Sequence, residues 1–227
     1  MAKVEQESAL SYRLIVVGGH TRSIGKTQLV CDLIAALPET KFIAGKITQY
    51  GHGVCAQNGE NCDCAPDEHS SAFNWEMDAA SGTDSSRFLA AGAARAFWLR
   101  TKQGYLAEGL PLLRRALTGL PHAAQEATAN VLIESNSLLQ FLKPALYIAV
   151  LDPNKEDFKA TARSLLDRAN VFVSRHELRG ASSPWPQISA KLLQGKPTFV
   201  QRETEPVPEG LLALLNEALA CPSGRRI

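Results

Sequence analysis

The segment that most constrains the fold is a strand-like run that leads into a glycine-containing turn and then into a helix. Residues 12–18 (YRLIVVG) are apolar and β-branched, as in a strand that is buried on both faces. Apolar residues then recur at helical spacing over 26–37, and Pro38 ends the pattern. Between the two lies the segment GHTRSIGKT, residues 19–27. A strand, a glycine-containing loop ending in Gly-Lys-Thr and a helix, in this order, are typical of a phosphate-binding P-loop.

In such a loop, backbone N–H groups and the helix N-terminus hold phosphate oxygens, the lysine reaches the terminal phosphates, and the threonine hydroxyl binds Mg²⁺. We therefore expect a nucleoside triphosphate and Mg²⁺ as cofactors, with Lys26 catalytic and Thr27 a metal ligand. His20 stands where the commonest pattern has glycine, so that five residues separate Gly19 from Gly25 instead of four. The alternative is a glycine-rich turn with a chance Gly-Lys-Thr, which the flanking strand and helix disfavour. The residues expected to bind the nucleotide in this loop are Gly19, His20, Thr21, Ser23, Ile24, Gly25, Lys26, Thr27 and Gln28.

Strand-like and helix-like segments alternate along the rest of the chain. This alternation predicts an α/β protein with the three-layer P-loop NTPase fold and a mainly parallel sheet. We expect one domain over 1–227, with a cysteine-bearing loop insert at about 49–81 that shows no sustained periodicity. The expected strands are 12–18, 41–47, 130–135, 145–151, 170–174 and an edge strand at 198–200, and the expected helices are 26–37, 84–100, one from 105 to about 117, one around 158–166 and one over 211–219.

Two charged residues near the ends of predicted strands are candidate catalytic groups. Glu134 follows the apolar run 131–133, which places its carboxylate at the carboxyl edge of the sheet, where open α/β folds bind ligands. There it could hold Mg²⁺ together with Thr27 and orient the attacking group. Lys46 lies at the end of the second strand and could pair with phosphate. The alternatives are a surface carboxylate and a solvated lysine.

Three of the five cysteines, Cys55, Cys62 and Cys64, lie within ten residues of one another. With His69 nearby, they could bind Zn²⁺ or an iron–sulfur cluster, which would supply ordering energy to a polar loop. The spacing fits no common zinc pattern, and reactive thiols or incidental cysteines are the alternatives.

The overall charge excludes several classes of partner. Lysine and arginine number 24 against 23 acidic residues, a formal net charge of +1, which leaves no excess to drive binding to nucleic acid or to a membrane surface. No apolar run is long enough to cross a bilayer, and the first residues lack a secretory pattern. We expect a soluble, cytoplasmic protein.

The chain resembles the molybdopterin-guanine dinucleotide biosynthesis adapter proteins of the MobB type. The resemblance rests on the P-loop, on the second strand with its lysine (GKITQYGH), on GTDSSRFLAAGA at 82–93 and on VLIES at 131–135. It implies that Asp84 and Arg87 take part in cofactor binding; a capping aspartate with an exposed arginine is the alternative. The longer P-loop also resembles that of dethiobiotin synthetases. The departures are His20, Ser135 after the glutamate, and the cysteine-bearing insert.

The resemblance implies binding of a nucleotide, GTP or ATP, with Mg²⁺, and assistance to a nucleotidyltransferase or a metalloenzyme client in molybdenum-cofactor or other metallocofactor maturation. Two alternatives stay open: an ATP-dependent ligase or kinase that acts on a small molecule, and a metal-binding module switched by nucleotide. Relatives of this class often form homodimers. The base preference is open, because residues 174–177 (SRHE) stand where a guanine-reading Asn-Lys-x-Asp motif is expected.

Overall fold

The described residues form a three-layer α/β fold, in which helices cover both faces of an eight-stranded sheet and seven of its strands run parallel. The computed structural model describes residues 12–50, 70–119, 129–178 and 183–220. The strand order is β3-β4-β2-β5-β1-β6-β7-β8, and only β3 runs antiparallel to its neighbour. The strands are β1 (Tyr12–Gly19), β2 (Phe42–Tyr50), β3 (Ser71–Glu76), β4 (Arg95–Lys102), β5 (Ala129–Glu134), β6 (Leu146–Leu151), β7 (Val171–Ser174) and β8 (Thr198–Val200).

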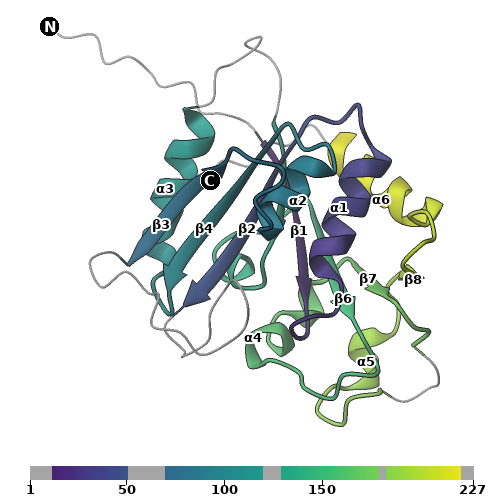
Figure 1. The fold of residues 1–227 in the computed structure, drawn as a ribbon. Helices are drawn as coiled ribbons and strands as arrows, with labels where there is room; N and C mark the ends of the chain where they lie inside the picture. Colours follow the sequence, from purple (N-terminus) through teal and green to yellow (C-terminus); the bar gives the residue numbers. More distant parts are fainter. Residues whose placement is uncertain (1–11, 51–69, 120–128, 179–182, 221–227) are drawn as a thin grey trace, which may run out of the picture.

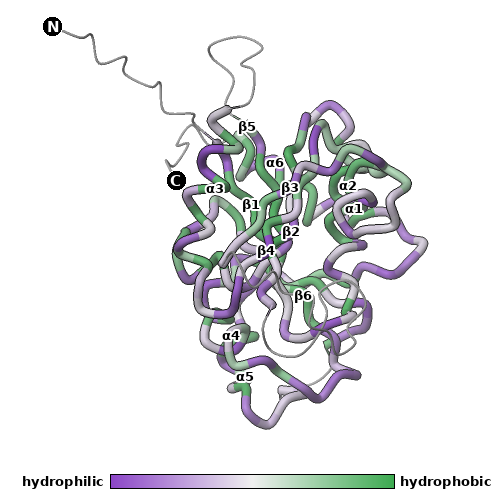
Figure 2. Tube along the Cα trace, turned by 60° about the vertical axis from the view of Figure 1, so that its left-hand side comes forward, coloured by the Kyte–Doolittle hydropathy of each residue, from purple (hydrophilic) through white to green (hydrophobic). Residues whose placement is uncertain are grey.

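The helices form the two outer layers. One face of the sheet packs against α1, α2 and α6, and the other packs against α3 and the segments around the short helices α4 and η2. In Figure 2 the central strands are hydrophobic, whereas the connections around α4 and α5 are largely hydrophilic. The helices are α1 (Lys26–Ala36), α2 (Asp84–Ala90), α3 (Leu106–Thr118), η1 (Ser137–Gln140), α4 (Ala160–Arg163), η2 (Leu166–Arg168), α5 (Ala190–Leu193) and α6 (Glu209–Ala220).

The position of β1 in the middle of the sheet places the loop that follows it at a ligand-binding position. β1 pairs with β5 on one side and with β6 on the other. The chain leaves β1 toward β2 and leaves β6 toward β7, in opposite directions along the sheet. Such a switch point at the carboxyl edge of the strands is where open α/β sheets bind ligands.

The predicted helix over 84–100 is wrong. Only its first part is helical, as α2, and residues 95–102 form β4 in the sheet. The chain changes direction at Gly92, whose φ is 105°, a value that glycine adopts without strain. The residues of β4 alternate in burial, with Phe97 and Leu99 fully buried and Trp98 partly buried. The whole of β4 pairs with β2.

The predicted loop at about 49–81 also differs in its described parts. β2 continues to Tyr50, and residues 71–76 form the edge strand β3. Phe73 and Trp75 pack on the core while Asn74 lies exposed between them, a period-two pattern too short to stand out in the sequence. The helix predicted around 158–166 is shorter, as α4 and η2, whereas the other predicted strands and helices are confirmed within a few residues.

Candidate phosphate-binding site

The P-loop connects β1 to α1 through a backbone that only a few residue types adopt easily. Gly25, the N-cap of α1, has φ 88° and ψ 15°, and Ser23 has φ 52°. No side chain caps the helix, because Gly25 has none to offer. The first N–H groups of an α-helix lack intrahelical acceptors. At α1 these donors, beginning with Lys26 and Thr27, therefore face the loop and are suited to an anion.

Asn136 holds the start of the loop in place, and the sequence reasoning missed it. Its side-chain oxygen accepts a hydrogen bond from the Gly19 N–H at 2.8 Å, and its amide nitrogen donates to the Gly19 carbonyl at 2.6 Å. Asn136 follows β5 by two residues, so this clamp fixes the P-loop to the neighbouring strand. No motif in the sequence announces it. The only signal is a polar residue just past the carboxyl end of a buried strand.

His20 is part of the support beneath the loop. Its ring is buried between Phe158 and Trp185, with both ring centroids 4.9 Å away. The Asp152 N–H donates to Nε2 at 3.0 Å, so the proton lies on Nδ1, which is 3.0 Å from the Asp157 carbonyl oxygen. Burial lowers the pKa of His20. Its own backbone N–H donates to the Val150 carbonyl. Ring and backbone amide of His20 are thus both engaged within the protein, and its contact with a nucleotide stays a prediction.

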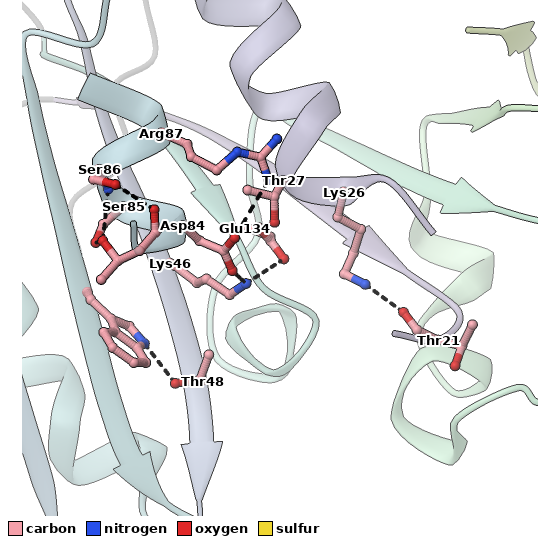
Figure 3. Close-up of polar contacts among 12 residues, drawn as sticks. Thr21, Lys26, Thr27, Lys46, Thr48, Asp84, Ser85, Ser86, Arg87 and Glu134 are labelled. Carbon is pink, nitrogen blue, oxygen red and sulfur yellow. Dashed lines mark hydrogen bonds and ion pairs between the residues drawn. The ribbon is translucent and has the colours of Figure 1, made fainter. Parts of the chain in front are cut away.

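Lys26 bends back onto its own loop. Its Nζ donates to the Thr21 carbonyl at 2.5 Å, as Figure 3 shows. The Thr21 hydroxyl in turn donates to Asp157, and the side chain of Ile24 is buried below the loop. Burial lowers the pKa of the Lys26 ammonium to about 8. An ammonium so poorly solvated gains strongly from an anion that approaches it.

Thr27 and Glu134 meet across two elements. The Thr27 hydroxyl donates to Glu134 Oε2 at 2.7 Å, and the Glu134 side chain is only 6% exposed. On its other side, Glu134 Oε1 lies 3.4 Å from Lys46 Nζ. Because Lys46 and Glu134 are register partners on the parallel strands β2 and β5, their side chains leave the sheet side by side.

Lys46 is paired with two carboxylates, which excludes the reading of a solvated lysine. Its Nζ forms an ion pair with Asp84 as well as with Glu134, and its side chain is 17% exposed. Burial acts to lower the pKa of Lys46, but the adjacent carboxylates outweigh burial and raise that pKa. Figure 3 shows Lys46 and Asp84 converging beside Glu134 from β2, α2 and β5.

Asp84 is not the helix cap. That place belongs to Thr83, whose hydroxyl accepts from the Ser86 N–H at 3.1 Å. Arg87, one turn on, lies 3.8 Å from Asp84 and donates to Gln28 Oε1 at 2.6 Å. Asp84, Arg87 and Gln28 therefore form a chain of contacts that links α2 to α1 beside the P-loop.

The metal site predicted at the cysteine group stays a prediction. Cys55, Cys62, Cys64 and His69 lie outside the described residues. Cys31 is buried in α1. Among residues 12–50, 70–119, 129–178 and 183–220, no three His, Cys, Asp or Glu side chains gather in a way that could hold a metal ion. Within the same ranges no helix is long and apolar enough to span a membrane.

A cavity of about 470 Å³ adjoins the P-loop on the β6–β7 side. Arg175 connects the two, because a Cβ added to Gly25 would meet its Nε at 2.8 Å. The Arg175 guanidinium is 3.8 Å from Glu203, and its Nη1 is buried without a hydrogen-bond partner in the described part of the chain. The lining residues are Pro153, Asn154, Arg175, His176, Glu177, Ser183, Pro184 and Arg202.

Comparisons with known proteins leave the family open. No protein-family model matches the chain, and no curated protein matches it. Among solved structures, the chain is similar to LpxK from Aquifex aeolicus, described as an "apo" form in complex with ATP, with 16% sequence identity and a TM-score of 0.45. The match covers 90% of this chain and 61% of LpxK, so the chain spans about three fifths of that protein. Strand order and loop geometry, rather than this likeness, carry the assignment of the fold.

Proposed function

We propose that this protein binds a Mg²⁺–nucleoside triphosphate in the loop 19–27 and acts on its γ-phosphoryl group. The observation that carries the proposal is the 2.7 Å hydrogen bond between Thr27 and Glu134, with an ammonium on either side, Lys26 and Lys46. A helix N-terminus, a hydroxyl, a carboxylate and two lysines then converge at one edge of the sheet. That set of groups matches the charge distribution of a triphosphate with its metal.

The donor set fits Mg²⁺. This cation prefers oxygen ligands and is usually held by one or two carboxylates or hydroxyls together with phosphates and water. Thr27 and Glu134 would hold it here. When bound, Mg²⁺ neutralises charge on the phosphoryl oxygens. The chain's own residues do the rest: the α1 N-terminus binds phosphate oxygens, Lys26 leaves the Thr21 carbonyl for the terminal phosphates, and Lys46 stabilises charge beside Glu134.

The cavity next to Gly25 supports a place for the rest of the nucleotide. It lies on the β6–β7 side, opposite to Lys46, and is large enough for a nucleoside at about 470 Å³. Arg175 and Asn154 offer donors there. The segment 174–177 carries none of the residues of a guanine-reading motif, so we propose no preference for GTP over ATP.

Three roles are compatible with this site, and they differ in what supports them. Assistance to metallocofactor maturation, with a nucleotidyltransferase or metalloenzyme client, was implied by the MobB resemblance, and no family model supports it. A nucleotide-switched metal module would depend on Cys55, Cys62 and Cys64, outside the described residues. Phosphoryl transfer to a small molecule has direct support from a second cavity beside Lys46, described below.

Isothermal titration calorimetry with Mg·ATP and Mg·GTP tests the proposal. We expect saturable binding of at least one of them by the unaltered protein and its loss in Lys26→Ala. Lys143→Ala is the matched control, because Lys143 is exposed and precedes β6 at the opposite edge of the sheet. Unchanged affinity in Lys26→Ala, or equal losses in both variants, would contradict the placement of the site.

A further inference from the structure

A second cavity, of about 210 Å³, lies on the other side of Lys46 from the P-loop. It is formed by β3, β4 and the beginning of α2. Taking about 30 Å³ for each water molecule, it has room for roughly seven waters, which corresponds to a compact metabolite and not to a second nucleotide. The lining residues are Asn74, Trp75, Glu76, Ser85, Trp98 and Arg100.

The strand register places this cavity next to the phosphate-binding groups. Asn74 pairs with Trp98, Trp98 with Lys46, and Lys46 with Glu134, so that these four residues form one row across β3, β4, β2 and β5. Directly opposed residues share a face of the sheet, and neighbouring strands are about 4.8 Å apart. Trp98 is therefore one strand away from Lys46. α2 makes a second connection, since Asp84 pairs with Lys46 while the next residue, Ser85, lines the cavity.

The side chains of the cavity are held rigidly, which suits a binding site. The Trp98 indole N–H donates to the Thr48 hydroxyl at 2.8 Å. The Arg100 guanidinium lies 4.9 Å above the Trp98 ring and donates to Asn74 Oδ1 at 2.8 Å. Glu76, on the cavity wall, accepts hydrogen bonds from the hydroxyls of Ser81, Thr83 and Ser85.

Arg100 is the cationic side chain that lines this cavity. Arg100 Nε is buried and has no hydrogen-bond partner within the described ranges. Nor does Arg100 form a salt bridge with any carboxylate in that part of the chain. Nε has no solvent-accessible surface and so does not face the cavity, but the rest of a guanidinium that lacks a carboxylate partner is suited to a planar anion such as a carboxylate.

We propose that this cavity binds the acceptor of the γ-phosphoryl group, a small organic molecule that carries a carboxylate for Arg100 and a hydroxyl or amine directed toward Lys46 and Asp84. The inference rests on the proposed function. In the transfer step the acceptor's oxygen or nitrogen forms a bond to the γ-phosphorus, the bond from that phosphorus to the β–γ bridging oxygen breaks, and the nucleoside diphosphate leaves. Asp84 takes the proton that the nucleophile loses.

The test uses the full chain with Mg·ATP or Mg·GTP and a panel of hydroxy acids, amino acids and aminobenzoates or hydroxybenzoates of up to about a dozen heavy atoms. Release of nucleoside diphosphate is followed, and phosphorylated product is identified by mass spectrometry. We expect at least one compound to raise turnover. In Arg100→Gln its KM should rise by about ten- to a hundredfold, the usual effect of a lost charged hydrogen bond, with nucleotide affinity and unstimulated turnover unchanged.

Arg95→Gln is the matched control, because Arg95 lies on the same strand, is exposed and does not line the cavity. Failure of the unaltered protein to bind nucleotide would contradict the proposed function. Nucleotide binding without stimulation by any compound of the panel, or an equal rise in KM in Arg95→Gln and Arg100→Gln, would overturn the acceptor site alone.

Discussion

The buried ammonium of Lys26 makes a quantitative prediction about stability. Its pKa in the folded protein is about 8 against 10.5 for an ordinary lysine, because burial disfavours the charged form. Each pKa unit corresponds to about 1.4 kcal/mol, so a folded protein at pH 7 carries a penalty of about 3 kcal/mol for this one charge. Lys26→Met removes the penalty but leaves the Thr21 carbonyl without its donor, at a cost of about 1 kcal/mol. We expect the variant to be more stable by about 2 kcal/mol at pH 7.

The pH dependence of this stability difference distinguishes the buried charge of Lys26 from a general packing effect. The folded pKa lies below the unfolded one, so the unfolded chain binds more protons between pH 8 and pH 10.5, and the stability of the unaltered protein rises there. The advantage of Lys26→Met should therefore be full below pH 8, fall to zero at about pH 10, and turn into a deficit of about 1 kcal/mol above about pH 10.5, where only the lost contact to the Thr21 carbonyl remains. Urea unfolding at several pH values measures it, with Lys143→Met as the exposed control. A variant that is less stable at pH 7, or an advantage independent of pH, would refute the reasoning.

Binding of Mg-nucleotide should make the unaltered protein more stable than Lys26→Met. A ligand at a hundred times its Kd stabilises the state that binds it by about 2.7 kcal/mol. Saturating Mg-nucleotide should therefore raise the unfolding free energy of the unaltered protein and leave Lys26→Met unchanged. The stability cost of Lys26 is thus the counterpart of its affinity for phosphate.

Three further variants test the supports of the site. Asn136→Ala removes both hydrogen bonds to Gly19, so unfolding experiments should show a loss of about 1–3 kcal/mol and titration should show weaker nucleotide binding. Asn136→Asp keeps only the hydrogen-bond acceptor and should restore part of the stability and part of the affinity. Gly25→Ala forces an L residue to φ 88° and places a Cβ against Arg175, so the unfolding free energy should fall by about 1–2 kcal/mol. An unchanged unfolding free energy would show that the loop adjusts freely. Glu134→Gln keeps a contact to Thr27 but removes the charge, so the rate of phosphate release should fall by about a hundredfold. Circular dichroism should show an intact fold. A normal rate of release would remove Glu134 from the mechanism.

The sequence predicts well what is local or follows from strand direction. The P-loop is one continuous segment, and Lys46 meets Glu134 because parallel strands end at the same edge of the sheet. The clamp by Asn136 depends on how the chain turns into η1 after β5, which no periodicity encodes. The edge of the sheet that carries β4 was also missed. Residues 89–100 are rich in alanine, leucine and arginine, all good helix formers, and only pairing with β2 and β3 makes residues 95–102 a strand.

Trp98 and Arg100 lie on β4, which the sequence pattern assigns to a helix. The second cavity, which both residues line, could therefore not be predicted from the sequence. With β4 in place, one cavity lies on the side of β1, β6 and β7, where we propose the nucleotide, and the other lies on the side of β2, β3 and β4, where we propose the acceptor, with Lys46 between them.

Both lysines at this border are engaged within the protein, Lys26 by the Thr21 carbonyl and Lys46 by Glu134 and Asp84. A bare triphosphate would have to displace these contacts while facing two carboxylates, which disfavours its binding. Mg²⁺ bound with the triphosphate would supply a competing cation for Glu134 and Asp84, and Lys46 would then be available to the phosphates. If the proposed function holds, this arrangement of charges would favour the metal complex over the free nucleotide, and it would couple nucleotide binding at the loop 19–27 to release of Lys46, the lysine next to the proposed acceptor cavity.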